Sequence, residues 1–440
     1  MESPDRLSYK PSKMATISWI LYDLANTAYS MNIVSLYFGT WFIKELGQNE
    51  AYESLVYSFS MLLVAITMPV FGDWSDCKNK KLAGLMLFTG VCIGSIFLIG
   101  MAGQQITTIS LLVPIVLILY VLANYTYQGG LVFYNALMPV VSTPKTIGRV
   151  SGYGVAIGYF GSIIGLVIAR LFVEGEAFGL KIPGVVRGGA IAAFIPTAIL
   201  FLVFAIPVFI FVKESAWSSG PEKNWSLRQS YNKVFRTIRD TQKHPGLLRF
   251  LIAKLIFEDS VETVVVKMGV TIQIIMGFGS EKANLFFIIL IPFAIIGSAI
   301  CGILTDHYGP KKTLMTVITL WIICLVFLAL TTNSTMFWIL GGILGALLGS
   351  TWTSARPLLI TLAPRENLGE FFGLYALSGK LAAILGPLIW SLVIIICKHR
   401  GLMFGYRAAI ISLAIIMMIG LLVLRGVPDF HHRLKKGSVT

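Results

Sequence analysis

The chain is poor in charged residues for its length. Of its 440 residues, 13% are charged and 56% are hydrophobic, whereas about a quarter of a typical soluble domain is charged. This composition excludes an ordinary soluble domain. Many apolar runs are long enough to cross a bilayer as helices, and they predict a polytopic helical membrane protein.

Residues for metal or nucleophile chemistry are also scarce. The five cysteines are scattered and form no CxxC pair, so they predict neither a disulfide framework nor a metal site. The five histidines fall outside the expected spans, and neither HExxH nor GxSxG occurs. No short alternating strands of a membrane barrel are visible. We therefore expect no cofactor, no metal and no enzymatic activity, and keep an intramembrane enzyme only as an alternative.

The net charge of +14 raises the question of a nucleic-acid partner. The basic residues lie mostly between the apolar runs, where membrane orientation and anionic lipid headgroups account for them. Membrane lipids are thus expected partners, and nucleic acid is not. The polar start, MESPDRLSYKPSK, has no cleavable signal pattern, so the first span is expected to direct insertion.

Twelve spans predict an all-α membrane protein with two pseudo-symmetric six-helix bundles. Residues 1–212 are expected to form the first bundle, 213–246 a cytoplasmic linker, 247–424 the second bundle and 425–440 a tail. In the linker, Ser226 to Asp240 has an amphipathic pattern, with Leu227, Tyr231, Val234 and Ile238 on one side. The predicted spans are 16–43, 53–72, 82–102, 106–134, 150–173, 188–212, 247–276, 284–304, 313–331, 336–361, 370–396 and 404–424.

Several polar residues lie within the first span. Asp23, Asn26 and Thr27 share one helical face. A carboxylate at membrane depth is costly, so it normally faces the protein interior or a water-filled path. We expect this face to contact substrate or to take part in ion coupling; a cluster that only holds helices together is the alternative.

Span 7 is the most polar span. Its three carboxylates and two lysines cannot all stay ionised unless they pair. Such a cluster suits a proton relay, and a neutralised structural ion network is the alternative. Span 11 carries one more lysine, which needs a carboxylate partner from span 7 or span 1, and the sequence leaves that choice open. The residues are Lys254, Glu258, Asp259, Glu262 and Lys267 in span 7, Lys380 in span 11 and Asp23 in span 1.

Spans 4 and 5 add uncharged polar side chains at mid-span. Asn124, Gln128 and Tyr159 are candidates to line a cavity, although tyrosines near an interface are often membrane anchors. Span 5 also carries a row of glycines from Gly148 to Gly165, which predicts close helix packing.

The sequence contains two internal repeats. YDLANT at 22–27 is echoed by EDSVET at 258–263, in spans 1 and 7. A second echo follows spans 2 and 8, at an offset of 230 residues: a glycine, an aspartate four residues later, then lysines. Many transporters are built from such repeats, with substrate bound between the halves near the bilayer midplane. The second pair comprises Gly72, Asp76, Lys80 and Lys81 in the first copy and Gly302, Asp306, Lys311 and Lys312 in the second.

The second repeat resembles the signature of the major facilitator superfamily. The resemblance implies that these residues act in conformational gating rather than in substrate binding. The first copy departs from the pattern, because Cys77 stands where a basic residue is usual and Asn79 where a glycine is usual. The second copy keeps that glycine.

Four further segments resemble the vacuole-effluxer-like branch of this superfamily. They are YDLANTAYS in span 1, FYNALMP at 133–139, GRVSGYGVAIGYFGSIIG at 148–165 and EFFGLYALSGKLAAILGPL at 370–388. The resemblance covers nearly all twelve spans. It implies export of small solutes, with amino acids the reported cargo of the fungal members. The loops are short, which favours a bacterial inner-membrane protein over a vacuolar one.

Together these observations predict a monomeric secondary transporter for a small polar or zwitterionic solute. Alternating access and proton-coupled efflux are expected, around a cavity lined by spans 1, 4, 5, 7, 10 and 11. A channel or lipid scramblase without ion coupling is the alternative. Transport in sealed vesicles separates these classes, because a coupled carrier saturates and responds to an imposed gradient.

The distribution of lysine and arginine predicts the topology. With the N-terminus inside, 24 of these residues fall on the inner side, 8 on the outer side and 3 within spans. Both termini and the linker should therefore be cytoplasmic. A single cysteine introduced by Ser219→Cys should resist an impermeant thiol reagent in whole cells and react after permeabilisation. Labelling in intact cells would contradict this topology.

Overall fold

The computed structural model describes residues 11–177, 179–181, 187–214, 223–239 and 246–430. The predicted tail from 431 onward, linker residues 215–222 and 240–245, and the Ser219 site lie outside these ranges. In the described part, ten helices are long and apolar enough to cross a membrane by length and composition. The two other predicted spans are a helical run from Lys13 to Glu45, which changes to π-helix after its first 17 residues, and α9, which carries the charged cluster.

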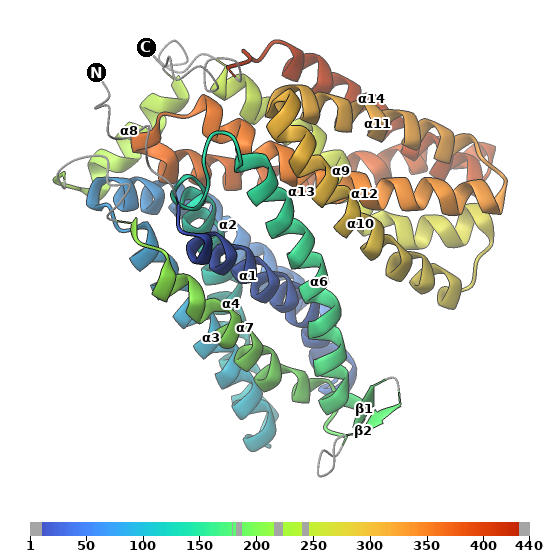
Figure 1. Cartoon of the computed structure of the whole chain (residues 1–440). Helices are drawn as coiled ribbons and strands as arrows, with labels where there is room; N and C mark the ends of the chain where they lie inside the picture. Colours follow the sequence, from blue (N-terminus) through green and yellow to red (C-terminus); the bar gives the residue numbers. More distant parts are fainter. Residues whose placement is uncertain (1–10, 178, 182–186, 215–222, 240–245, 431–440) are drawn as a thin grey trace. The chain divides into compact units, whose positions relative to one another are not determined.

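The first half of the chain supplies six long helical runs (Figure 1). Between α6 and α7, two short strands pair antiparallel. The elements are α1 (Lys13–Tyr29) with its π-helical continuations η2 (Ser30–Tyr37) and η3 (Thr40–Glu45), α2 (Glu50–Lys78), α3 (Lys81–Gln105), α4 (Ile109–Ala136), α5 (Met138–Val141), α6 (Ile147–Glu174), β1 (Glu176–Ala177), β2 (Leu180–Lys181), η4 (Ala190–Ala193) and α7 (Phe194–Phe211).

The second half begins with a short helix and continues with six long ones. The elements are α8 (Leu227–Arg239), α9 (Leu247–Met276), α10 (Ser280–Tyr308), α11 (Pro310–Leu330), α12 (Ser334–Leu362), η6 (Arg365–Asn367), α13 (Leu368–Cys397), η7 (Lys398–Arg400) and α14 (Leu402–Arg425).

The helices cluster into two compact units, and the division falls inside α6. Of the described residues, the N-terminal unit holds 11–143 and those from 157 to 226, and the C-terminal unit holds 144–156 and those from 227 to 430. The start of α6 thus groups with the second half, whereas the sequence places it in the first bundle. Contacts between the start of α6 and α10, described below, are the physical reason.

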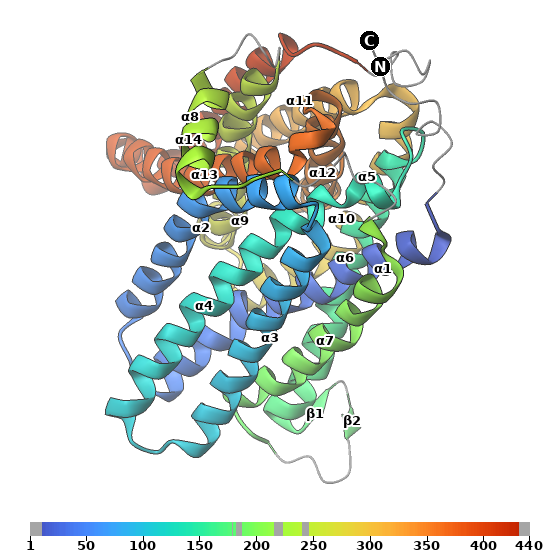
Figure 2. The same ribbon diagram turned by 90° about the vertical axis from the view of Figure 1, so that its left-hand side faces the viewer.

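The two units repeat the same set of helix pairs (Figures 1 and 2). In the N-terminal unit, α2 packs on α4, α1 on α7, and α3 on both α4 and α7. In the C-terminal unit, the corresponding pairs are α10 with α12, α9 with α14, and α11 with both α12 and α14. The predicted two-fold repeat is therefore a repeat of packing as well as of sequence.

Glycines bring α6 close to α1. A Cβ at Gly158 would lie 2.7 Å from the Thr27 hydroxyl, and a Cβ at Gly161 would clash with the carbonyl oxygen of Leu24. Near the other end of the contact, Asn32 of η2 donates to the Gly165 carbonyl at 2.9 Å. Small residues let helix backbones approach where no aqueous hydrophobic effect drives association.

The turns after α2 and α10 reverse the chain with different residues. Asn79 adopts the left-handed conformation (φ 51°) at the end of α2, and its backbone N–H donates to the carbonyl of Ser75 in the last turn of that helix. At the equivalent place after α10, Gly309 has a φ of 97° and Pro310 then starts α11. Asparagine tolerates a positive φ better than most residues, which explains how the first copy dispenses with its glycine.

We predict that Gly161→Ala lowers stability by about 1–3 kcal/mol, because the added methyl group meets backbone that cannot yield. Gly90 of α3 is the matched control, since a Cβ there meets no atom within 4 Å. Gly90→Ala should leave the melting temperature unchanged or raise it slightly. Thermal unfolding in detergent compares the two variants, and equal melting temperatures would argue against tight α1–α6 packing.

Candidate functional site

Two charged side chains of α9 form a buried pair. Lys254 and Glu258 lie one turn apart, make an ion pair, and expose 2% and 9% of their side chains. The Lys254 ammonium also donates to the carbonyl of Tyr375 at 3.1 Å and lies 3.8 Å from the centre of its ring. Lys254 is thus satisfied by a carboxylate, a carbonyl and an aromatic face from α9 and α13.

A second carboxylate of α9 is bonded to the backbone of α13. Asp259 is buried and accepts a hydrogen bond from the backbone N–H of Gly386. A Cβ at Gly386 would clash with the Thr263 hydroxyl, so this glycine permits the contact between α9 and α13. The arrangement repeats that of α1 and α6: Thr27 and Thr263 each donate to the carbonyl four residues earlier, at 2.8 and 2.7 Å.

Glu262 and Lys380 differ from these neighbours. Both are half-buried, and neither makes a hydrogen bond or an ion pair to any residue that the structure describes. They nonetheless interact electrostatically, and Glu262 is the charge that acts most strongly on Lys380, ahead of Glu258. No ion pair among the described residues assigns a partner to Lys380, so the choice that the sequence leaves open stays a prediction.

The polar residues predicted in span 1 lie inside the N-terminal unit. Asp23 and Asn26 are each 4% exposed, and the Thr27 hydroxyl is bonded within α1. The Asp23 carboxylate is close enough to Tyr22 and Tyr127 to interact with them electrostatically.

Three further candidates lie on α4 and α6 of the same unit. Asn124 is fully buried and donates to the Tyr120 carbonyl at 2.9 Å, which favours a packing role. Gln128, on the same helix, is half-buried and makes no hydrogen bond to the described residues. Tyr159 is half-buried, and its carbonyl accepts from Ser162 at 2.7 Å.

Asp306, in the second copy of the glycine–aspartate motif, caps the start of α6. Its carboxylate accepts from the backbone N–H groups of Gly148 (2.7 Å) and Arg149 (3.1 Å) and from the Arg149 guanidinium (2.7 Å). A helix N-terminus attracts negative charge, and here it also supplies two unpaired donors. Gly302 permits the approach, because a Cβ there would lie 2.7 Å from the Gly148 carbonyl oxygen.

Residues of the first copy of the motif make contacts within the N-terminal unit. Asp76 pairs with Lys81 at 2.8 Å, and Gly72 is buried while Lys80 is exposed. The backbone N–H groups of Lys81 and Leu82 donate to the Glu214 carboxylate at 2.8 and 2.9 Å. Burial raises the pKa of Glu214, and these N–H donors and the charge of Lys81 oppose that shift.

In the C-terminal unit, a lysine rather than a carboxylate connects the third long helix to the last one. The Lys311 ammonium donates to the carbonyl of Arg425, at the end of α14, at 3.0 Å. In the N-terminal unit, an acidic group that follows α7 instead holds the start of α3. Each unit thus ties its third helix to its last one, once through a helix N-terminus and once through a helix C-terminus.

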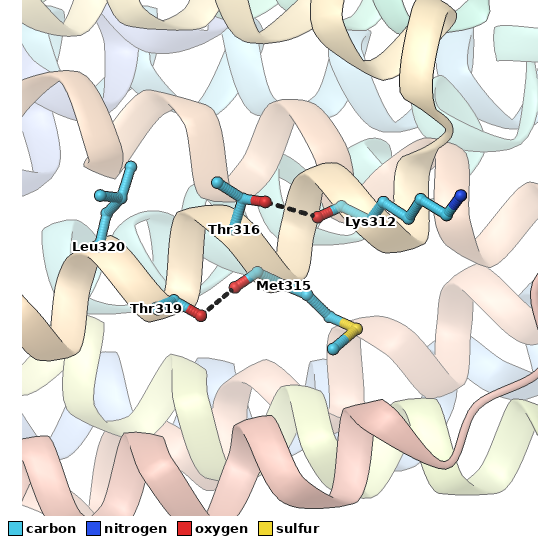
Figure 3. A pocket seen from close by; sticks show the side chains of 5 residues that line it. All are labelled: Lys312, Met315, Thr316, Thr319 and Leu320. Carbon is cyan, nitrogen blue, oxygen red and sulfur yellow. Dashed lines mark hydrogen bonds between the residues drawn. The ribbon is translucent and has the colours of Figure 1, made fainter.

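A groove of about 370 Å³ runs along α11, but it lacks the features of a polar substrate site (Figure 3). The hydroxyls of Thr316 and Thr319 donate to carbonyls of their own helix, at 3.0 and 2.8 Å. Its wall therefore presents methyl groups, as membrane-facing helices do. The lining residues are Lys312, Met315, Thr316, Thr319 and Leu320.

Three residues that make buried or helix-end contacts were not predicted from the sequence. Glu214 is an isolated acid just after span 6, Glu370 is the acid in the first turn of α13, and Tyr375 is an aromatic residue near a lone lysine. The position of Glu370 at a helix start was a usable signal. The other two act through contacts that no local pattern reveals.

Comparisons with known proteins agree with this geometry. The family model described as "Vacuole effluxer Atg22 like" matches residues 42–433. The MFS-type transporter YxiO of Bacillus subtilis (strain 168) is 26% identical over 430 residues, covering 94% of each chain. The multidrug resistance protein MdtG of Proteus mirabilis (strain HI4320) is 25% identical, with 92% of this chain and 93% of that protein covered. The structure of XylE, a proton:xylose symporter of the major facilitator superfamily, matches with a TM-score of 0.63 at 13% identity, over 96% of this chain and 97% of that one.

Two repeated six-helix units with charged groups inside them define an integral membrane protein of the major facilitator superfamily, a secondary transporter rather than an enzyme. The predicted fold class is therefore confirmed. The chain belongs to the vacuole effluxer Atg22-like family, as the four sequence segments led us to expect.

The buried pair on α9 predicts a non-additive mutant cycle. Lys254→Met should destabilise the protein by about 3–5 kcal/mol, because it leaves Glu258 buried without its partner. The double variant Lys254→Met/Glu258→Gln should regain most of that loss, since no buried charge of the pair remains. Thermal unfolding in detergent measures both. A double variant no more stable than the single one would show that the pair is not coupled.

Proposed function

We propose that this transporter exports a small polar or zwitterionic solute in exchange for protons, and that Glu262 is the coupling carboxylate. The supporting observation is the contrast within α9. Glu258 is held by Lys254 and Asp259 by a backbone N–H, whereas Glu262 makes no hydrogen bond or ion pair to the described residues. A carboxylate without a fixed partner is the one that can bind and release a proton at least structural cost.

Lys380 gives Glu262 an alternative to the proton. When the Lys380 ammonium or the ammonium group of a solute is near, the ionised carboxylate is favoured; when both are elsewhere, a proton must balance the carboxylate instead. Solute and proton would therefore compete for Glu262. This competition exchanges solute for protons if the solute-loaded and the protonated states open to opposite sides.

The substrate class follows from the same two groups. A zwitterion offers a carboxylate to Lys380 and an ammonium group to a carboxylate, which suits the pair better than a neutral sugar. The family description as an effluxer supports export as the direction.

A screen identifies the solute before the mechanism is tested. Amino acids, small organic acids, organic bases, nucleosides and lipophilic drugs are compared by thermal shift, because a ligand of the native state raises its stability. The drugs are included because MdtG is described as a multidrug resistance protein. A shift by drugs alone would replace the zwitterion proposal. The solute that gives the largest shift is then used in radiolabelled form.

We predict that Glu262→Gln abolishes transport driven by an imposed proton gradient but leaves solute counterflow within about twofold of wild type, since counterflow needs no net proton movement. Proteoliposomes loaded with the identified solute measure both. Glu174→Gln is the control, because Glu174 forms an exposed pair with Arg170 at the end of α6 and such pairs contribute little. Wild-type transport that is insensitive to collapse of the proton gradient would refute coupling; loss of both activities in Glu262→Gln would indicate a structural role.

A further inference from the structure

The linker between the two halves is attached at its beginning to the N-terminal unit. Glu214 accepts hydrogen bonds from the first backbone N–H groups of α3, at 2.8 and 2.9 Å. Further along, the backbone N–H of Lys223 donates to the Cys77 carbonyl at 2.9 Å. Both attachments hold the turn between α2 and α3, which carries the first copy of the glycine–aspartate motif.

The linker helix α8 is attached to the C-terminal unit through Glu370. The Glu370 carboxylate is fully buried, pairs with the Lys233 ammonium at 3.0 Å and accepts from the Thr237 hydroxyl at 2.7 Å. Glu370 lies in the first turn of α13, where the helix N-terminus also favours its charge. A buried carboxylate depends on such partners, so this contact is hard to break without consequence.

The packed face of α8 differs from the apolar face expected from sequence. Ser230 and Val234 are buried, and Lys233 and Thr237 contact Glu370 on the same side. Leu227, which was expected on the apolar side, is 56% exposed, and Tyr231 is half-buried; the side chain of Ile238 lies outside the described residues. Among the described side chains, two polar contacts to one buried carboxylate thus accompany the packing of this face.

We propose that linker residues 223–237, here called the strap, connect the α2–α3 turn of one unit to α13 of the other. The contacts of Lys233 and Thr237 with Glu370, here called the lock, hold the strap on α13. Residues 224–232 separate the last N-terminal anchor from Lys233, and from Leu227 onward they are helical. A helix rises only about 1.5 Å per residue, so the helical part of this connection limits how far the two anchors can separate. Because α13 also carries Gly379, Lys380 and Gly386, tension on its first turn acts on the helix that packs against the α9 charges. The strap therefore restricts the motions of the two units during alternating access.

The proposal stands on the transporter class and not on the coupling role of Glu262. Its test uses purified protein in lipid nanodiscs and needs no substrate. Spin labels are placed at Thr107, in the α3–α4 turn, and Thr332, in the α11–α12 turn, which are both exposed and lie in different units. Serine replaces the two half-buried cysteines, Cys77 and Cys397. Double electron–electron resonance then reports the distribution of distances between the labels.

Two independent changes release the strap. Lys233→Met with Thr237→Val removes the lock, and insertion of Gly-Gly-Ser after Ser226 lengthens the strap while it leaves both anchors in place. We expect each change to raise the minor distance population at least fivefold. Arg228→Ala, an exposed substitution on the same helix, should match the parent.

The outcomes separate a strap from a structural contact. Unchanged distance distributions in both released variants would overturn the proposal. A change seen only in Lys233→Met/Thr237→Val, together with a lower melting temperature, would overturn it as well, because the contact would then serve only to stabilise the C-terminal unit. A change in both variants, with the insertion variant as thermally stable as the parent, is the expected result.

Discussion

A charge placed inside an apolar helix must find its partner within the protein, and this constraint organises the C-terminal unit. Lys254 and Glu258 meet it through each other and through Tyr375, and Asp259 meets it through the backbone of α13. These contacts require α9 and α13 to lie very close together. The burial of these charges and the packing of α9 against α13 are therefore linked.

Glycine makes that closeness possible in both units. Gly386 admits Thr263 and Asp259 of α9, as Gly158 admits Thr27 and Asp23 of α1. The repeated threonine, bonded to the carbonyl one turn earlier, shows that two halves with different side chains keep the same backbone arrangement. The halves differ in charge instead: the C-terminal unit concentrates carboxylates and lysines, whereas Asp23 lies among tyrosines. The two units thus combine similar packing with different electrostatics.

Helix termini supply several of the polar contacts between elements. Asp306 caps α6, Glu214 caps α3, Lys311 reaches the end of α14, and Glu370 lies at the start of α13. A helix end presents unpaired donors or acceptors and a partial charge, so one side chain can hold it with several hydrogen bonds. Such contacts are local and directional. They can be made and broken as a unit moves more readily than contacts between packed apolar surfaces.

The membrane class, the twelve spans, the two-fold repeat and the family could be predicted from the sequence, because these depend on the length and spacing of apolar runs and on motifs local in the chain. The sequence also singled out the charged residues of span 7, since a charge in an apolar run is conspicuous without any coordinates. Three assignments needed the three-dimensional structure: Lys254 pairs with Glu258, Glu262 makes no hydrogen bond or ion pair to the described residues, and Glu370 holds the linker helix. Those assignments depend on distances between groups that lie as far as 137 residues apart in the chain, as Lys233 and Glu370 do, and a one-dimensional pattern carries no information about such distances.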